Sequence, residues 1–279
     1  MSRFSASDAA LEGFQVIRVQ WRVVLGWCLF SLLGYVGVVV LSLIVIAAVT
    51  LAAATREQAN ALGGAAGGTV LFLGWSVIQW MVLAALYRMS LRPAAEPGLY
   101  HLRLSRDEGR LFGLWLGVLA VFGGLMVAGY LGLRRLGEAS GAASAIGTLA
   151  FLAVMTWLAL RISLAGPANF ATGRFGLAES WRLTRGQAWA LLGMVVLALC
   201  LLALIAIVLF IATALIQAAI GGFHTLSPVD LSDRGAFAER PGAFVFALAA
   251  ELAIAPIYLV IAQAPFVAAY KALSAPPAD

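Results

Sequence analysis

The chain has 279 residues, of which 63% are hydrophobic and only 11% are charged, and its mean hydropathy is +0.98. A soluble core of this length cannot bury so much apolar surface, so the composition excludes an ordinary globular protein and indicates an integral membrane protein. The net charge of +5 does not indicate nucleic-acid binding, because the basic residues flank apolar runs instead of forming one solvated face.

Six apolar runs are long enough, or nearly so, to cross a bilayer as helices, which takes about 20 residues each. None alternates with the period of two that an outer-membrane strand requires, so the predicted fold is an all-α polytopic membrane protein. The first and fifth runs overshoot a hydrocarbon core of about 30 Å and must tilt or overhang. The runs are Val23–Ala54, Thr69–Tyr87, Leu111–Leu133, Ala142–Leu160, Ala188–Ile220 and Ala243–Tyr270.

A sequence motif recurs where odd-numbered runs begin. Glu12–Gly26 (EGFQVIRVQWRVVLG) aligns without gaps to Glu179–Gly193 (ESWRLTRGQAWALLG), and Leu102–Gly113 (LRLSRDEGRLFG) matches the same frame more weakly. The even-numbered runs close on similar end motifs, YRMSL, LRISL and YKAL. The pattern predicts one membrane domain, 1–279, built from three helical hairpins at 7–93, 97–167 and 174–273, with a disordered tail at 274–279.

Two copies of the start motif have the S/T-x-x-E/Q form of a capping box, in which side chains satisfy backbone groups at a helix start. They are Ser105–Glu108 and Thr184–Gln187, so the third and fifth spans are expected to begin there. The first copy has Ile17 at the cap position, which predicts that the preceding helix runs on into the span with a bend. Prolines 93, 97 and 167 are expected to mark turns after returning spans.

Short amphipathic helices are predicted before the first and fifth spans and are expected to lie in the headgroup plane. Their apolar faces carry Leu11, Phe14, Ile17 and Trp21, and Phe175, Leu177, Ala178 and Trp181. One interpretation makes the neighbouring arginines caps, anchors and topology signals. The other makes them contacts for anionic lipid headgroups in one cytoplasmic-side pocket, formed by Arg18, Arg88, Arg106, Arg161 and Arg185.

The distribution of basic residues predicts the orientation. Five of the eighteen Lys and Arg residues fall on one side of a six-span topology, namely Arg56, Arg134, Arg135, Arg234 and Arg240. The other thirteen lie on the side of both termini, which is therefore expected to be cytoplasmic. No cleavable signal peptide is evident. The abundance of Ala, Gly and Arg with a single Lys is typical of GC-rich bacterial coding, which suggests the bacterial inner membrane.

Glu251 is the one acid within a predicted span, where a charge costs roughly 2.5–3.5 kcal/mol. It is expected either to bind a proton or cation, aided by Pro256 and Pro265, or to form a neutral hydrogen bond to a neighbouring helix. Gln79 and Gln263 are candidates for the same intramembrane polar site or for interhelical hydrogen bonds. In the third span, small residues at Gly113, Gly117, Gly124 and Ala128 predict close helix packing.

The sequence contains no hydrolase, metalloprotease, nucleotide-binding or redox motif, so no catalytic residue, cofactor or metal site is predicted. Cys28 and Cys200 lie in apolar runs and form no disulfide framework. His101 and His224 are expected on opposite sides of the membrane and cannot share a site. The loop 221–242 is expected to be a partner surface or a polar linker.

The stretch RISLAGPANFATGRFGLAESWRLTRGQAWALLG resembles bacterial polytopic proteins related to the membrane domain of glycerophosphoryl diester phosphodiesterases. The end motif of that family matches Arg161, Ser163, Leu164, Gly166 and Pro167. Its start motif matches Glu179, Ser180, Trp181, Leu183, Thr184 and Gly186. The resemblance covers about 40 residues. It implies a non-catalytic membrane module, because this chain lacks the separate soluble barrel with its His, Glu and Asp residues.

Three functions therefore remain open. The chain is expected to be a lipid-associated or partner-binding module, in contact with membrane lipids, a second copy of itself or another membrane protein. The alternative is a small-solute or lipid transporter that uses Glu251. An intramembrane enzyme has the least support, because no acid, base and nucleophile appear on one side.

Overall fold

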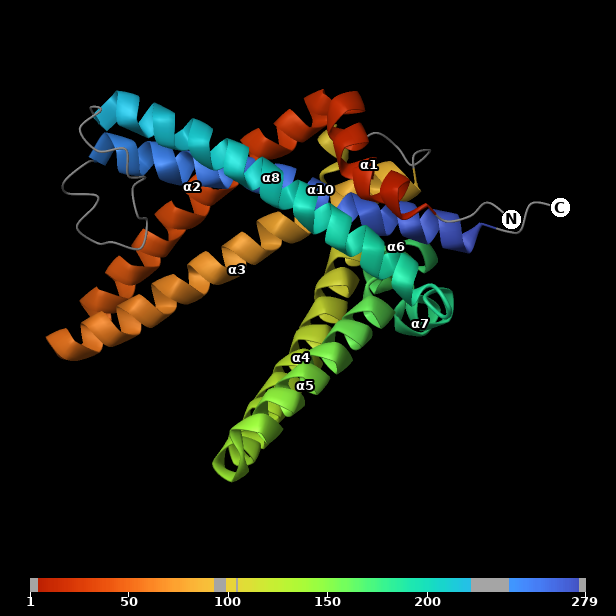
Figure 1. The fold of residues 1–279 in the computed structure, drawn as a ribbon. Coiled ribbons are helices and arrows are strands. Elements are labelled where there is room, and N and C mark those ends of the chain that lie inside the picture. The colour runs from red at the N-terminus through yellow and green to blue at the C-terminus, as the bar shows by residue number, and fades with distance from the viewer. Residues whose placement is uncertain (1–4, 93–98, 104, 222–240, 276–279) are drawn as a thin grey trace. The chain divides into compact units, whose positions relative to one another are not determined.

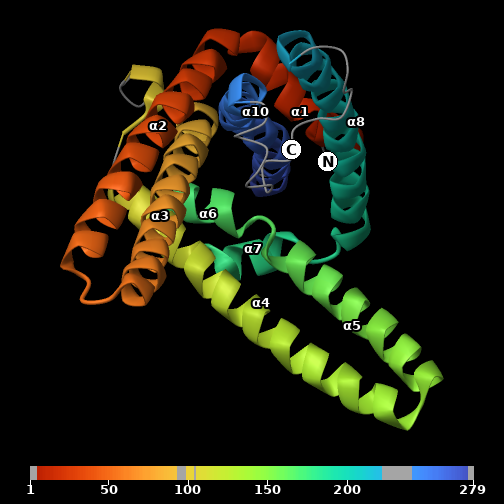
Figure 2. The same ribbon diagram turned by 90° about the vertical axis from the view of Figure 1, so that its left-hand side faces the viewer.

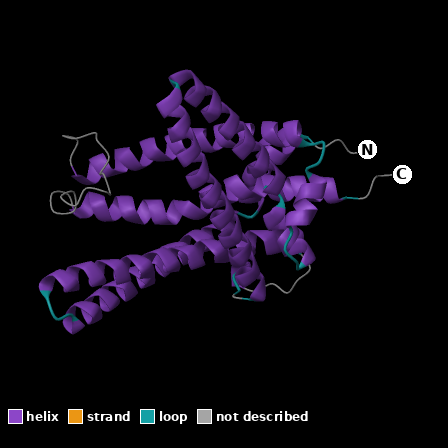
Figure 3. Cartoon of the chain, turned by 90° about the horizontal axis from the view of Figure 1, so that it is seen from below, coloured by secondary structure: helices purple, strands orange, loops and turns teal. Residues whose placement is uncertain are grey.

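The computed structural model describes residues 5–92, 99–103, 105–221 and 241–275. Every regular element in these ranges is helical (Figure 3). Six of the described helices are long and apolar enough to cross a membrane. The predicted all-α, six-span architecture is confirmed, and the chain is a multi-pass integral membrane protein.

Figure 1 shows the helices in chain order. The six long ones are α2 (Trp21–Ala52), α3 (Arg56–Leu91), α4 (Arg106–Ala139), α5 (Gly141–Ile162), α8 (Ala188–Gly221) and α10 (Pro241–Ser274). The shorter ones are α1 (Ala6–Val19), the 3-10 turn η1 (Leu99–His101), α6 (Ala165–Thr172) and α7 (Leu177–Leu183).

Helix starts follow local chemistry more than hydropathy. Helix α3 begins thirteen residues before the predicted Thr69, because Thr55 caps it: its Oγ1 accepts from the Gln58 N–H at 3.2 Å. Helix α1 passes into α2 through a single non-helical residue, Gln20, at φ −109° and ψ 30°. The predicted bend before the first span is confirmed. Helix α10 continues through Pro256 and Pro265 without a break.

The chain divides into two compact units. Unit 1 consists of Met1–Glu12, Ala84–Leu197 and Gln263–Asp279, and unit 2 of Gly13–Leu83 and Ala198–Ala262. The borders between the units fall inside helices and do not coincide with the borders of the three predicted hairpins. The hairpin repeat therefore stays a prediction.

In unit 2, α2 packs against α3 through small residues and aromatic rings. Tyr35 and Trp75 stack with ring centroids 4.8 Å apart, and Ser42 Oγ donates to the Gly67 carbonyl at 3.1 Å. Helix α1 meets α10 by direct backbone contact, since a Cβ added to Gly13 would lie 2.7 Å from Ile261 Cα.

In unit 1, α4 and α5 form an antiparallel hairpin (Figure 2). Its close contacts lie at Gly129, against the Phe151 ring, and at Gly147, against two leucines. The prediction of close packing at Gly113, Gly117 and Gly124 is wrong for the described residues: added methyl groups there would meet open space. Sequence spacing alone could not tell which glycines face the partner helix.

The core of unit 1 forms around α6, which the sequence did not predict. The Pro167 turn is wrong: Pro167 lies in the first turn of α6, where its missing N–H leaves no helical bond unmade. All residues from Ala165 to Phe170 are buried. Helix α6 packs against α4 and α7. The largest fully buried side chains of the unit are Leu86, Tyr87, Leu111, Leu164, Phe170, Leu191, Met194 and Val267.

Replacing Gly166 with alanine should lower the free energy of unfolding by about 1–3 kcal/mol, because a Cβ there would lie 2.7 Å from the Tyr87 hydroxyl. In a Tyr87→Phe background the same substitution should cost less. Denaturant titrations of the unchanged protein, the two single variants and the double variant form a double-mutant cycle that measures the difference. An unchanged cost in the phenylalanine background would show that the hydroxyl is not the obstacle.

Candidate functional site

Arg88, in the last turn of α3, is held by protein groups. It forms an ion pair with Glu108 in the first turn of α4, with side chains 12% and 5% exposed. Its guanidinium also donates to the His101 carbonyl at 2.9 Å and to Ser105 Oγ at 3.2 Å. The guanidinium predicted to face lipid phosphates is occupied by protein acceptors. We call Arg88, His101, Ser105 and Glu108 the Arg88 cluster.

The capping box in this cluster forms as predicted. The Ser105 N–H donates to Glu108 Oε2 at 2.7 Å, and Ser105 Oγ accepts from the Asp107 N–H at 3.2 Å. Asp107 in turn pairs with Arg92 and Arg110. Glu108 therefore caps α4 and neutralises Arg88 at the same time.

Arg161, in the last turn of α5, occupies the equivalent place in the next end motif but has a different environment. Its guanidinium carbon lies 5.4 Å from the ring centroids of both Trp157 and Trp181. These indoles meet edge to face, 5.4 Å apart and at 87°. Its Nε and Nη1 are buried with no hydrogen-bond partner among the described residues. We call Arg161, Trp157 and Trp181 the Arg161 site.

The Arg161 site is positioned by α7. Ser180 Oγ donates to the Arg161 carbonyl at 2.7 Å, which fixes α7 to the end of α5. Thr184 Oγ1 donates to the carbonyls of Ser180 at 2.9 Å and Trp181 at 3.3 Å. Thr184 is thus the C-cap of α7, and the prediction that it forms a capping box at the start of α8 is wrong. Gly186, between α7 and α8, has a φ of 82°, a left-handed conformation that favours glycine.

The predicted start motifs that follow the two arginines differ in sequence. Aligning Leu102–Gly113 with the start motif at 181–192 puts Gln187 opposite Glu108. The copy at 179–193 therefore has an amide where the copy at 102–113 has a carboxylate. Glu179, the nearest acid in this motif, pairs instead with Arg182 at 2.7 Å on the surface. The guanidinium of Arg161 carries a charge that no described carboxylate pairs.

An apolar groove adjoins the Arg161 site. It lies between α5 and α8, has a volume of about 390 Å³, and shares Trp157 with the site. All of its lining residues belong to unit 1. They are Ala153, Thr156, Trp157, Leu160, Ala188, Trp189 and Leu192. Trp189 is 85% exposed, as an indole at a membrane interface would be.

The other predicted headgroup contacts are exposed arginines. Arg106 and Arg185 in unit 1, and Arg18 in unit 2, have exposed side chains. Phe175, Leu177 and Trp181 are exposed as well, which agrees with an apolar face on α7. The convergence of all five arginines on one pocket stays a prediction.

The three predicted intramembrane polar residues have different surroundings within their own units. Gln263 Oε1 accepts from the Tyr87 hydroxyl at 3.3 Å in the core of unit 1. Gln79 Oε1, in unit 2, is buried with no partner among the described residues. Glu251 lines a groove between α8 and α10 that neither glutamine lines.

Sequence reasoning missed the two indoles around Arg161 and the absence of a described carboxylate paired with it. The available signal was the comparison of start motifs, in which Gln187 aligns with Glu108. Of the described residues, no group of three His, Cys, Asp or Glu side chains could hold a metal ion. Comparison of the chain with known protein families, curated proteins and solved structures gives no match.

Proposed function

We propose that this chain is a non-catalytic, lipid-associated membrane module in which Arg161 binds the phosphate of an anionic phospholipid. The observation that carries the proposal is the state of the Arg161 guanidinium, with two buried N–H donors that have no acceptor in the described chain. A buried donor without an acceptor costs about 1–3 kcal/mol, and an anion recovers that cost. Arginine suits phosphate because its planar fork donates two parallel hydrogen bonds.

The surroundings favour a lipid over a free anion. The residue Arg161 is only partly buried as a whole, whereas its Nε and Nη1 are buried. Trp157 belongs both to the arginine site and to the groove of about 390 Å³, so a phosphate on Arg161 leaves an acyl chain beside Trp157, Leu160 and Leu192. Indole rings supply apolar contact to chains and polar N–H groups to the interface.

The distribution of basic residues supports a location for this site. Arg161, Arg182 and Arg185 all fall on the arginine-rich side of the six-span topology. We infer that this side faces the cytoplasm of a bacterium, so the ligand belongs to the inner leaflet of the inner membrane. The motif resemblance to the membrane domain of glycerophosphoryl diester phosphodiesterases supports the same class of non-catalytic module.

Replacing Arg161 with glutamine should weaken retention of phosphatidylglycerol at least tenfold, which corresponds to about 1.4 kcal/mol. Native mass spectrometry of the protein with phosphatidylglycerol or phosphatidylcholine measures it. Arg161→Lys should retain part of the affinity, since the charge stays and the fork is lost. Arg135→Gln, which removes the same charge from an exposed position at the far end of α4, is the matched control.

Three outcomes would contradict the proposal. The first is unchanged lipid retention in Arg161→Gln. The second is equal losses in Arg161→Gln and Arg135→Gln, which would indicate nonspecific charge attraction. The third is competition by inorganic phosphate at the affinity of the lipid, which would indicate a free-anion site. Arg106→Gln and Arg185→Gln then test whether the other start-motif arginines share the headgroup.

A further inference from the structure

The groove that contains Glu251 is formed by two matching stripes of side chains. Helix α8 contributes positions 206, 207, 209, 210, 213 and 217, and α10 contributes 247, 250, 251, 254 and 258. Each set contains residues three and four apart, which lie on one helix face. Such stripes usually interdigitate, but here they enclose a groove of about 470 Å³, within the size range of small-ligand sites.

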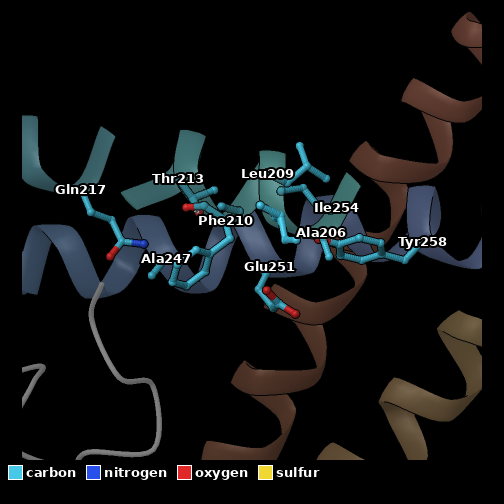
Figure 4. Close-up of a pocket in the computed structure, with 11 residues that line it drawn as sticks. Ala206, Leu209, Phe210, Thr213, Gln217, Ala247, Glu251, Ile254 and Tyr258 are labelled. Atoms are coloured by element: carbon cyan, nitrogen blue, oxygen red, sulfur yellow. Dashed lines mark hydrogen bonds between the residues drawn. The ribbon is translucent and has the colours of Figure 1, made fainter. Parts of the chain in front are cut away.

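Most side chains that line the groove are apolar, and a few polar side chains lie among them. Figure 4 shows Gln217 at one end, Tyr258 at the other and Glu251 between them. The Thr213 hydroxyl donates a hydrogen bond to the Phe210 carbonyl at 3.0 Å. Glu251 is exposed in the groove. Of the described residues that line the groove, none is a cation.

The depth of Glu251 limits what can neutralise it. It lies ten residues into α10, about 15 Å along a helix that is about 51 Å long. When α10 is centred in a hydrocarbon core of about 30 Å, Glu251 lies about 5 Å inside the core boundary. A charge at that depth is costly without a partner. A ligand that brings an ammonium to this depth must also bring an apolar chain.

We propose that this groove binds an amphiphilic primary amine, with its ammonium on the Glu251 carboxylate and its alkyl chain along Phe210, Leu209 and Ile254. An ammonium has three N–H donors, which the Glu251 carboxylate oxygens can accept. Phe210 lines the groove from α8 and offers apolar contact to the alkyl chain. This site lies entirely in unit 2 and is independent of the Arg161 site.

Equilibrium binding of radiolabelled dodecylamine to the protein in phosphatidylcholine nanodiscs tests the proposal, with empty nanodiscs giving the partition background. The chain should show saturable binding, and Glu251→Gln should weaken it at least tenfold. Glu251→Asp, which keeps the charge, should weaken it less. Dodecyltrimethylammonium, with no N–H donor, should bind more weakly than dodecylamine. Arg161→Gln should leave amine binding unchanged, which separates this site from the phospholipid site.

The matched control is Glu57→Gln, which removes one exposed acid from the same unit outside the groove. Its amine binding should equal that of the unchanged chain. Three results would overturn the proposal. The first is saturable amine binding that is unchanged in Glu251→Gln, and the second is an equal loss of amine binding in Glu57→Gln and Glu251→Gln. The third is the absence of amine binding in a chain that forms a dimer, when the Glu251→Gln variant of that chain is monomeric. The last result would assign the groove to a second copy of the chain. Should Glu251→Gln fail to fold, Phe210→Ala, expected to weaken binding about threefold or more, replaces it in the comparison.

Discussion

Replacing Arg88 with methionine should lower the free energy of unfolding by about 3–5 kcal/mol, because it leaves the Glu108 carboxylate buried without its cation. Glu108 is 5% exposed and also caps α4, so the carboxylate cannot simply turn to solvent. Denaturant titration of the purified protein in micelles, followed by circular dichroism, measures the loss. Adding Glu108→Gln should recover part of it, since the amide preserves the cap and removes the unpaired charge.

The control for this prediction is Arg182→Met. It breaks the Arg182–Glu179 pair, whose side chains are 76% and 26% exposed. Exposed pairs contribute about 0–1 kcal/mol. Equal losses in Arg88→Met and Arg182→Met would mean that burial of the Arg88 cluster has no energetic consequence.

Replacing Gln187 with glutamate should weaken phosphatidylglycerol binding about tenfold, because it adds a carboxylate three residues after Thr184, whose hydroxyl oxygen lies 3.5 Å from the Arg161 carbonyl oxygen. An internal anion would then compete with the lipid phosphate for Arg161. Native mass spectrometry with the lipids named above measures the effect. The reciprocal change, Glu108→Gln, should not create a lipid site equal to that of Arg161, because Arg88 keeps the His101 and Ser105 acceptors.

The matched control is Gln58→Glu, which adds the same charge at the start of α3 in unit 2. It should leave phosphatidylglycerol retention within about twofold, a difference of about 0.4 kcal/mol. Retention that falls equally in Gln58→Glu and Gln187→Glu would indicate general repulsion of anionic lipid. Unchanged retention in both variants would show that a carboxylate at position 187 does not compete with the lipid phosphate for Arg161.

The six spans could be predicted because hydropathy reports the property that a bilayer selects. The capping box at Ser105 could also be predicted, since its side chains and backbone groups lie within one turn of each other. The identical pattern at Thr184 was misinterpreted because the outcome depends on whether a helix already precedes it. Helix α7 ends at this point, and the Thr184 hydroxyl donates to one of its last carbonyls, that of Ser180.

The groups that surround Arg88 and Arg161 could be predicted only in part. Arg88 and Arg161 look alike in their end motifs, YRMSL and LRISL, and the sequence gives both the same two interpretations, a structural anchor or a lipid contact. Their difference lies in the Glu108 carboxylate, which pairs with Arg88, and in two indoles, which lie beside Arg161 on different helices. Helix α6 was missed for a similar reason: AGPANFAT contains Gly and Pro, and its helical state is stabilised by burial.

The contact between Gly13 and Ile261 has a consequence for biosynthesis. Proline has no N–H, so Pro265 leaves the Ile261 carbonyl without its usual helical donor. A Cβ on Gly13 would lie 3.3 Å from that oxygen, so the bare glycine Cα–H can approach it. The docking surface for α1 therefore does not exist until the ribosome has made about 250 further residues. At about 5–20 residues per second, the first helix waits on the order of 10–50 s before it can reach its final position.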